Sequence, residues 1–138
     1  MITPESIVAA ARAHVGTPFR HQGRLPGKAL DCAGLVIMTA RAIGLNPNDR
    51  TGYPRRPFSG LMESVLDAQP CLRRVEREPQ AGDVLLLRFE GDPQHLAICA
   101  GETIIHAWAQ PGVVAENDFT ADWRRRMVRV YEFREVEA

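Results

Sequence analysis

Hydrophobic and polar positions divide the chain into two parts with different periodicity. Apolar residues of the first part recur every three or four positions, which is typical of helices that bury one face. Later apolar runs are short and separated by Gly and Pro, which is typical of strands. Helices are predicted over about 4–15, 32–43 and 59–68, with one helical turn starting at 120–123, and strands at about 72–76, 83–89, 95–100, 103–108, 112–115 and 128–133. This order predicts an α+β domain with N-terminal helices packed on an antiparallel sheet of five to six strands.

The most apolar of these segments begins at Asp31-Cys32. Only Thr39 and Arg41 are clearly polar within 32–43, so this helix should be buried nearly all round. Asp31 suits the N-cap position, which places Cys32 in the first turn. There the positive end of the helix dipole would favour the reactive thiolate. The alternative interpretation is that Cys32 is a small buried hydrophobe, as most free cysteines are.

Two histidines flank a predicted hairpin. Gly101-Glu102 has the glycine-first pattern of a two-residue type II′ turn, which pairs Ala97 with His106. His95 and His106 then lie on one face as diagonal neighbours, with backbones roughly 7–8 Å apart. Two imidazole rings can bridge that gap. A register slip of one residue would place the two rings on opposite faces.

A thiol and two imidazoles suit nucleophilic catalysis. Cys32 would be the nucleophile, His95 the base that holds the thiolate as an ion pair and later protonates a leaving amine, and His106 the group that orients His95. Peptide N–H groups at the start of the helix could stabilise an oxyanion. The same three side chains could instead bind zinc, although no second sulfur stands nearby in a ligand motif.

The other histidines and cysteines are weaker candidates for a catalytic role. Cys99 shares the predicted histidine face and is assigned to core packing, and Cys71 starts a strand without a basic neighbour. His14 is expected at the surface or boundary of the first helix. His21 lies in the 17–30 loop before Asp31 and is a candidate for contacting a substrate.

Length and charge narrow the range of functions. The 138 residues suit one domain spanning 1–138, and 17 basic against 17 acidic residues argue against nucleic acid as a partner and give no support for a membrane partner. Three cysteines without a CxxC pair indicate neither a disulfide framework nor a structural metal. The N-terminus lacks a charged and apolar leader, so no signal peptide or membrane span is expected, and no cofactor is predicted.

Four short motifs, in this order, carry a family resemblance: Asp31-Cys32-Ala33-Gly34-Leu35-Val36, Ala81-Gly82-Asp83-Val84, His95-Leu96-Ala97-Ile98 and Ile105-His106-Ala107. They resemble the NlpC-type cell-wall cysteine peptidases. The resemblance implies a papain-like fold and a catalytic triad of Cys32, His95 and His106. It also implies cleavage of peptidoglycan stem peptides, in relatives typically between γ-linked D-glutamate and a diamino acid such as meso-diaminopimelate.

Two positions depart from the family pattern. Ala33 stands where the family usually has Ser, which should cost little because a small residue is kept. Phe19 stands where the family usually has a Tyr whose hydroxyl assists near the oxyanion. Losing one such donor can lower a rate by about 10²-fold.

The chain further resembles the family members found in bacteriophage tails, through Tyr53–Pro57 and Trp123–Arg126 and the absence of an attached binding module. This implies synthesis in the bacterial cytoplasm, a place at the virion tail tip, and other tail proteins as partners besides stem peptides. The arginine run is either a docking surface or a solvated face. Two alternatives stay open: a structural tail-tip component with little or no activity, and an amidase or acyl transferase using the same triad.

Overall fold

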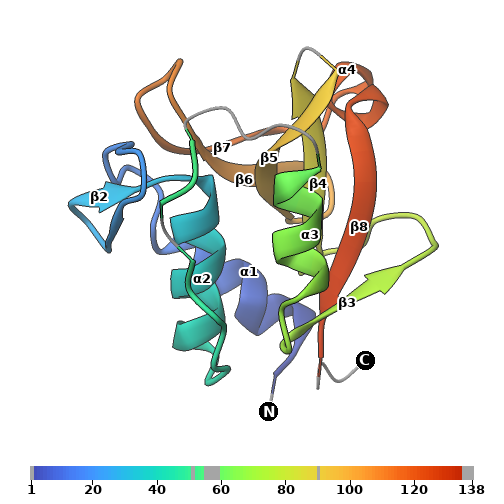
Figure 1. Ribbon diagram of the computed structural model, residues 1–138, viewed down its shortest axis with the longest axis horizontal. Helices are drawn as coiled ribbons and strands as arrows, with labels where there is room; N and C mark the ends of the chain where they lie inside the picture. Colours follow the sequence, from blue (N-terminus) through green and yellow to red (C-terminus); the bar gives the residue numbers. More distant parts are fainter. Residues whose placement is uncertain (1, 51, 55–59, 90, 135–138) are drawn as a thin grey trace.

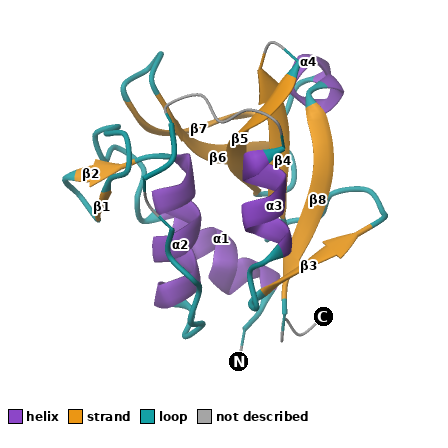
Figure 2. Ribbon diagram, in the orientation of Figure 1, coloured by secondary structure: helices purple, strands orange, loops and turns teal. Residues whose placement is uncertain are grey.

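The computed structural model describes residues 2–50, 52–54, 60–89 and 91–134. Three helices, α1 (Pro4–Arg12), α2 (Cys32–Ala42) and α3 (Leu61–Asp67), precede the main sheet, and a short α4 (Ala121–Arg125) precedes its last strand. The main strands are β3 (Leu72–Val75), β4 (Val84–Phe89), β5 (Asp92–Cys99), β6 (Thr103–Trp108), β7 (Val113–Asp118) and β8 (Met127–Phe133). Helices α1 to α3 lie on one side of this sheet (Figures 1 and 2). The predicted α+β class is therefore confirmed.

The sheet is antiparallel, with strand order β3-β8-β4-β5-β6-β7. The hairpin of β5 and β6 has the predicted register: Cys99 pairs with Ile104, and the Ala100 N–H donates to Thr103 O at 2.8 Å. Gly101 has φ +98°, which suits the first position of a type II′ turn. The adjacent strands β5, β6 and β7 therefore bring residues far apart in sequence to one region.

The sheet has an apolar cluster on each face. Leu96, Ile98, Ile105 and their neighbours join the helices in the larger cluster, whereas Leu85, Ala97, Cys99 and Ile104 form the smaller one with Trp123 packed against it. Cys99 is fully buried, as its assignment to core packing predicted. Because alternate residues of a strand face opposite sides, the side chains of His95 and His106 belong to the face of the smaller cluster.

Several local predictions were wrong. Helix α1 ends at Arg12 rather than near 15, so Val15, which the apolar stripe of the predicted helix includes, is 46% exposed. The 17–30 loop contains a small ribbon, β1 (Arg24–Leu25) paired with β2 (Ala29–Leu30). In α3, the sequence pattern places Leu61, Val65 and Leu66 inward, whereas the buried residues are Met62 and Leu66.

The start of β5 also differs from its prediction. The predicted strand begins at 95, whereas β5 already begins at Asp92 and includes Pro93. The register with β4 shifts between Leu87 and Arg88, where β5 carries an extra residue, Gln94, next to this proline, which cannot donate a ladder hydrogen bond. The parts of 46–58 that are described, 46–50 and 52–54, hold neither helix nor strand, as predicted, and the rest of that segment and Ser59 lie outside the described residues. No helix in the described part of the chain is both long and apolar enough to cross a bilayer.

Candidate active site

Cys32 is the first residue of α2 and lies on the wall of a cleft of about 640 Å³ that His95 also lines. Asp31 caps the helix, since its Oδ1 accepts the Gly34 N–H at 2.7 Å. The Cys32 thiol faces the backbone N–H of Leu96, the residue that follows His95 on β5. The structure therefore brings the predicted nucleophile and base to one cleft, from two elements distant in the sequence.

The predicted contact between the two histidines is present. His95 Nε2 lies 2.7 Å from His106 Nδ1, and His106 Nε2 lies 2.7 Å from Asn117 Oδ1. Because the amide oxygen of Asn117 can only accept, it fixes His106 with its proton on Nε2. His106 Nδ1 then accepts from His95 Nε2–H, which leaves His95 Nδ1 without a proton and able to take one from the thiol.

Asn117 was not anticipated from the sequence. The predicted strand stopped at 115, before the polar residues Glu116-Asn117-Asp118, whereas β7 continues to Asp118. In the observed register His106 pairs with Ala115, so Asn117 is its diagonal neighbour on the same face. The same diagonal rule that predicted the histidine pair would have found Asn117 if the strand had been assigned its full length.

The pKa values of Cys32 and His95 are shifted in the direction opposite to the one predicted. Burial and the neighbouring Asp31 carboxylate raise the pKa of the Cys32 thiol to about 12, against smaller opposing effects from the Leu96 and Ala33 N–H groups and Arg24. Burial, with the adjacent His106, holds the pKa of His95 well below its usual range. Both shifts favour a neutral thiol and a neutral imidazole over the predicted thiolate–imidazolium ion pair, because burial and the charge of Asp31 oppose the effect of the helix dipole on Cys32.

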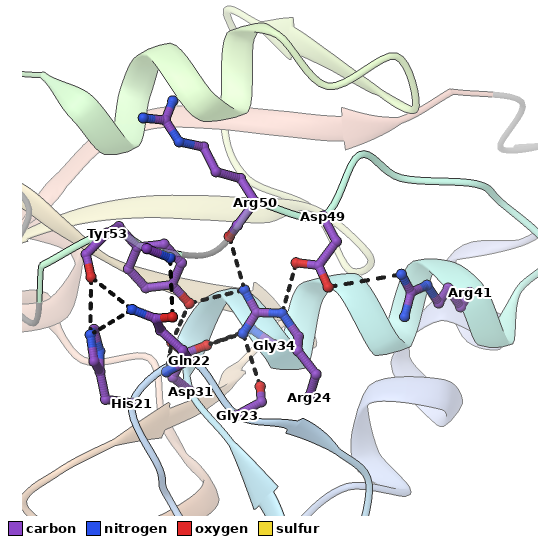
Figure 3. A network of polar contacts seen from close by, with 11 residues as sticks. His21, Gln22, Gly23, Arg24, Asp31, Gly34, Arg41, Asp49, Arg50 and Tyr53 are labelled. Atoms are coloured by element: carbon purple, nitrogen blue, oxygen red, sulfur yellow. Dashed lines mark hydrogen bonds and ion pairs between the residues drawn. The ribbon is translucent and has the colours of Figure 1, made fainter.

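The Asp31 carboxylate is the centre of a polar network (Figure 3). It is buried and accepts hydrogen bonds from the Gln22 N–H, the Gly34 N–H, Arg24 and the Tyr53 hydroxyl. The Arg24 contact is an ion pair of 2.9 Å between side chains that are 13% and 5% exposed. The network holds the start of α2, and with it Cys32, in place.

Arg24 connects this helix start to the proline-rich segment. Its guanidinium also donates to Asp49 Oδ1 and to the Tyr53 hydroxyl, each at 2.9 Å. Although burial opposes it, hydrogen bonds to Tyr53 and Asp49 and the charge of Asp31 raise the pKa of Arg24, so the side chain stays charged. Gly34 permits the close approach of the 23–24 backbone, since a Cβ there would lie 2.1 Å from Gly23 O.

The cleft is also lined by Phe19, Tyr53 and His21, which are relevant to the family hydroxyl missing at Phe19 and to contact with a substrate. Phe19 lines the cleft, and so does Tyr53, which brings a phenol hydroxyl to it from another segment. That hydroxyl is engaged by Asp31 and Arg24. His21, the candidate for substrate contact, also lines the cleft, and its Nε2 lies 3.0 Å from the carbonyl oxygen of Tyr53.

Aromatic rings form the wall of the cleft around His95. The imidazole stacks on Phe89 at a centroid distance of 4.9 Å, and Trp123 lies 6.2 Å away. Trp108 stacks on His106 at 5.2 Å. These rings exclude water from the imidazoles, which is one reason why burial dominates the pKa of His95.

The remaining candidates lie elsewhere. Cys71 is buried and is not among the residues of this cleft, and His14 is half-buried beyond the end of α1, at the boundary as predicted. Across residues 2–50, 52–54, 60–89 and 91–134, no group of three or more His, Cys, Asp or Glu side chains is placed to hold a metal ion.

Comparison with known proteins agrees with this architecture. The model of the NlpC/P60 family matches residues 16–132. No curated protein matches the sequence. Similar solved structures include the NlpC/p60 domain of the peptidoglycan hydrolase SagA (22% identity, TM-score 0.64, 94% of this chain and 97% of that one) and the peptidoglycan hydrolase RipB from Mycobacterium tuberculosis (20% identity, TM-score 0.67, 98% and 65%).

A third similar structure is RipD from Mycobacterium tuberculosis, described as a non-catalytic NlpC/p60 domain protein adapted to peptidoglycan binding (20% identity, TM-score 0.59, 94% and 95%). At such identities these likenesses show a shared fold, and the fold is common to catalytic and non-catalytic proteins. The family match spans both candidate catalytic strands and the helix that carries Cys32. The chain therefore belongs to the NlpC/P60 family.

Proposed function

We propose that the protein is a cysteine endopeptidase that hydrolyses peptidoglycan stem peptides, with Cys32 as nucleophile, His95 as base and His106 as the residue that orients His95. The observation that carries the proposal is the hydrogen-bonded chain from Asn117 through His106 to His95, in the cleft that also holds the Cys32 thiol. The bond between D-glutamate and a diamino acid is the proposed site of cleavage, as in the relatives that the motifs resemble.

The reaction would start from the neutral pair. His95 Nδ1 takes the thiol proton as Cys32 Sγ attacks the carbonyl carbon, which gives a tetrahedral oxyanion and an imidazolium. The Cys32 backbone N–H, at a helix start where N–H groups lack intrahelical acceptors, is the proposed oxyanion donor. The imidazolium then protonates the leaving amine, the C–N bond breaks and a thioester forms. Water attacks the thioester with His95 as base, and the acid and the free thiol are released.

The decisive experiment is digestion of purified peptidoglycan, followed by mass analysis of the released stem peptides. The wild type and Cys71→Ala, which removes a thiol outside the cleft, should release the same products, whereas Cys32→Ala should release none. Equal release by the wild type and Cys32→Ala would refute the proposal. The masses of the products also separate an endopeptidase from an amidase, which would free whole stem peptides.

A second candidate is a peptidoglycan-binding protein without activity. RipD shows that this fold can take such a role, and the raised pKa of Cys32 and the absence of a hydroxyl at Phe19 favour it here. Binding of peptidoglycan by the wild type without release of any peptide would establish this candidate in place of the enzyme.

A place in a bacteriophage tail tip is a further proposal, supported by the two sequence stretches that resemble the tail-associated members. Tyr53 and Pro54 line the cleft, and the rest of the first stretch lies outside the described residues. In the second stretch Trp123 and Arg126 line the cleft, whereas Arg124 and Arg125 are exposed. Detection of the chain in purified tail particles would support the proposal, and its absence from them would refute it.

A further inference from the structure

The end of the cleft beyond His95 is where the leaving part of a substrate would lie. Because the base must protonate the leaving amine, the amino acid after the cleaved bond has to sit against the imidazole. The wall on that side consists of Phe89, stacked on His95 at 4.9 Å, and Trp123 at 6.2 Å. Such rings favour contact with the aliphatic part of an amino acid.

Arg126 places a positive charge on this wall. Its guanidinium carbon lies 5.6 Å from the ring centre of Phe89 and 5.7 Å from that of Trp123. Among the described residues that line the cleft, Arg126 is the one Lys or Arg. The leaving side of the cleft therefore combines an apolar surface with a cation at its margin.

The charge of Arg126 is available to a ligand. Its partner is Asp122, at 3.3 Å between Nε and Oδ2, and the two side chains are 38% and 62% exposed. Asp122 is shared with Arg125 at 3.4 Å, so two guanidinium groups compete for one carboxylate. An exposed pair of this kind is weak and exchanges readily for another anion.

We propose that Arg126 is a specificity-determining residue that binds a carboxylate of the amino acid on the leaving side of the cleaved bond. The proposal rests on the proposed peptidase function, which defines the leaving side. A guanidinium forms strong, directional hydrogen bonds with a carboxylate. A diamino acid with a free carboxylate fits this end, because its aliphatic chain can pack on Phe89 and Trp123 while its carboxylate reaches Arg126.

The test measures binding, without turnover, in Cys32→Ala protein by calorimetry. The ligands are the tripeptide L-alanyl-γ-D-glutamyl-diaminopimelate with both diaminopimelate carboxylates free, and the same tripeptide with both as amides. Adding Arg126→Gln should weaken binding of the free acid about tenfold and leave binding of the diamide unchanged, since one charge-assisted hydrogen bond is lost. Arg126→Lys should recover part of the affinity. Arg124→Gln is the matched control and should change neither, because Arg124 is exposed outside the cleft and its guanidinium lies over Phe119 at 4.1 Å, away from Asp122.

Three results would overturn the proposal: equal affinity of the Cys32→Ala parent for both tripeptides, unchanged affinity in Arg126→Gln, or no measurable binding to the parent at millimolar ligand. Circular dichroism of each variant separates misfolding from loss of the contact. Cleavage by the wild type decides the peptidase proposal separately. If binding is selective and needs Arg126 but the wild type cleaves nothing, the role of Arg126 is established and the peptidase proposal is refuted. If the wild type cleaves but Arg126→Gln binds as before, the peptidase proposal is supported and the role of Arg126 is refuted.

Discussion

Removing the charge of Arg24 should destabilise the protein much more than the same substitution at Arg12. Arg12 and Arg24 pair with their carboxylates at 2.8 Å and 2.9 Å, so the two contacts have nearly the same length. They differ in burial, because the side chains of Arg24 and Asp31 are 13% and 5% exposed whereas those of Arg12 and Glu116 are 53% and 22% exposed. Substitution by Met removes each guanidinium and keeps most of the aliphatic chain.

The expected loss follows from what Asp31 would keep. Breaking a buried ion pair by removing one partner costs about 3–5 kcal/mol, because the other charge is left without compensation. Asp31 would still accept from the Gln22 N–H, the Gly34 N–H and the Tyr53 hydroxyl, so the lower end, about 3 kcal/mol, applies. For a domain of this size that is a fall in Tm of roughly 10 °C. Arg12→Met should leave Tm almost unchanged, since exposed pairs contribute little.

Urea unfolding and thermal melting of the two variants measure the difference. The double variant Arg24→Met with Asp31→Asn tests whether the unpaired charge of Asp31 causes the loss of stability. Asn still caps the helix but has no charge that would be left unpaired. The double variant should be more stable than Arg24→Met alone. An equal loss for Arg24→Met and Arg12→Met would refute the reasoning, and a double variant less stable than Arg24→Met would show that the unpaired charge is not the source of the cost.

Further predictions concern the thiol and the imidazoles. Alkylation of Cys32 by iodoacetamide should rise continuously from pH 6 to pH 10 without a plateau, since the pKa of the thiol is raised to about 12; a plateau below pH 8 would restore the ion pair. Asp31→Asn should speed this alkylation at a given pH because Asp31 raises the pKa of Cys32, and an unchanged rate would contradict that cause. The acid limb of kcat/KM should lie below pH 6.5, because His95 acts as base only when neutral and its pKa is lowered, so more acid is needed to protonate it; a limb above pH 6.5 would argue against this. Asn117→Leu should lower kcat about tenfold with little change in KM, with recovery in Asn117→Asp, which keeps an acceptor for His106; loss of KM alone would show a different role.

Local sequence patterns were sufficient to predict the parts of the site that depend on hydrophobic periodicity, helix capping and turn type. The two-residue turn at Gly101-Glu102 fixed the register of β5 and β6, and the contact of His95 with His106 followed from it. The N-cap at Asp31 likewise placed Cys32 in the first turn of α2. Both inferences use only interactions between residues that are close in the sequence or joined by a tight turn.

Other contacts of the site depend on packing between residues far apart in the sequence, and no local sequence pattern predicts them. In the sequence, Arg24 is one of several basic residues in a loop. Its role in holding the start of α2 becomes visible only in the structure, where Asp49 and Tyr53 contact it. Arg126 belongs to a run of three arginines, of which it alone lines the cleft. Periodicity cannot distinguish a solvated arginine from one at a cleft when the segment forms a single short turn, as α4 does.

The charge state of the nucleophile shows most clearly why local reasoning was not sufficient. A helix N-terminus favours a thiolate by an amount that a nearby carboxylate and burial can outweigh. Asp31, which the helix needs as its cap, is also the carboxylate that raises the pKa of Cys32, and Arg24 offsets this only in part. The residue that positions the proposed nucleophile therefore also favours its protonated form. In the proposed mechanism, proton transfer to His95 therefore accompanies attack on the substrate carbonyl, and the neutral thiol should react slowly with alkylating agents and oxidants before a substrate is bound.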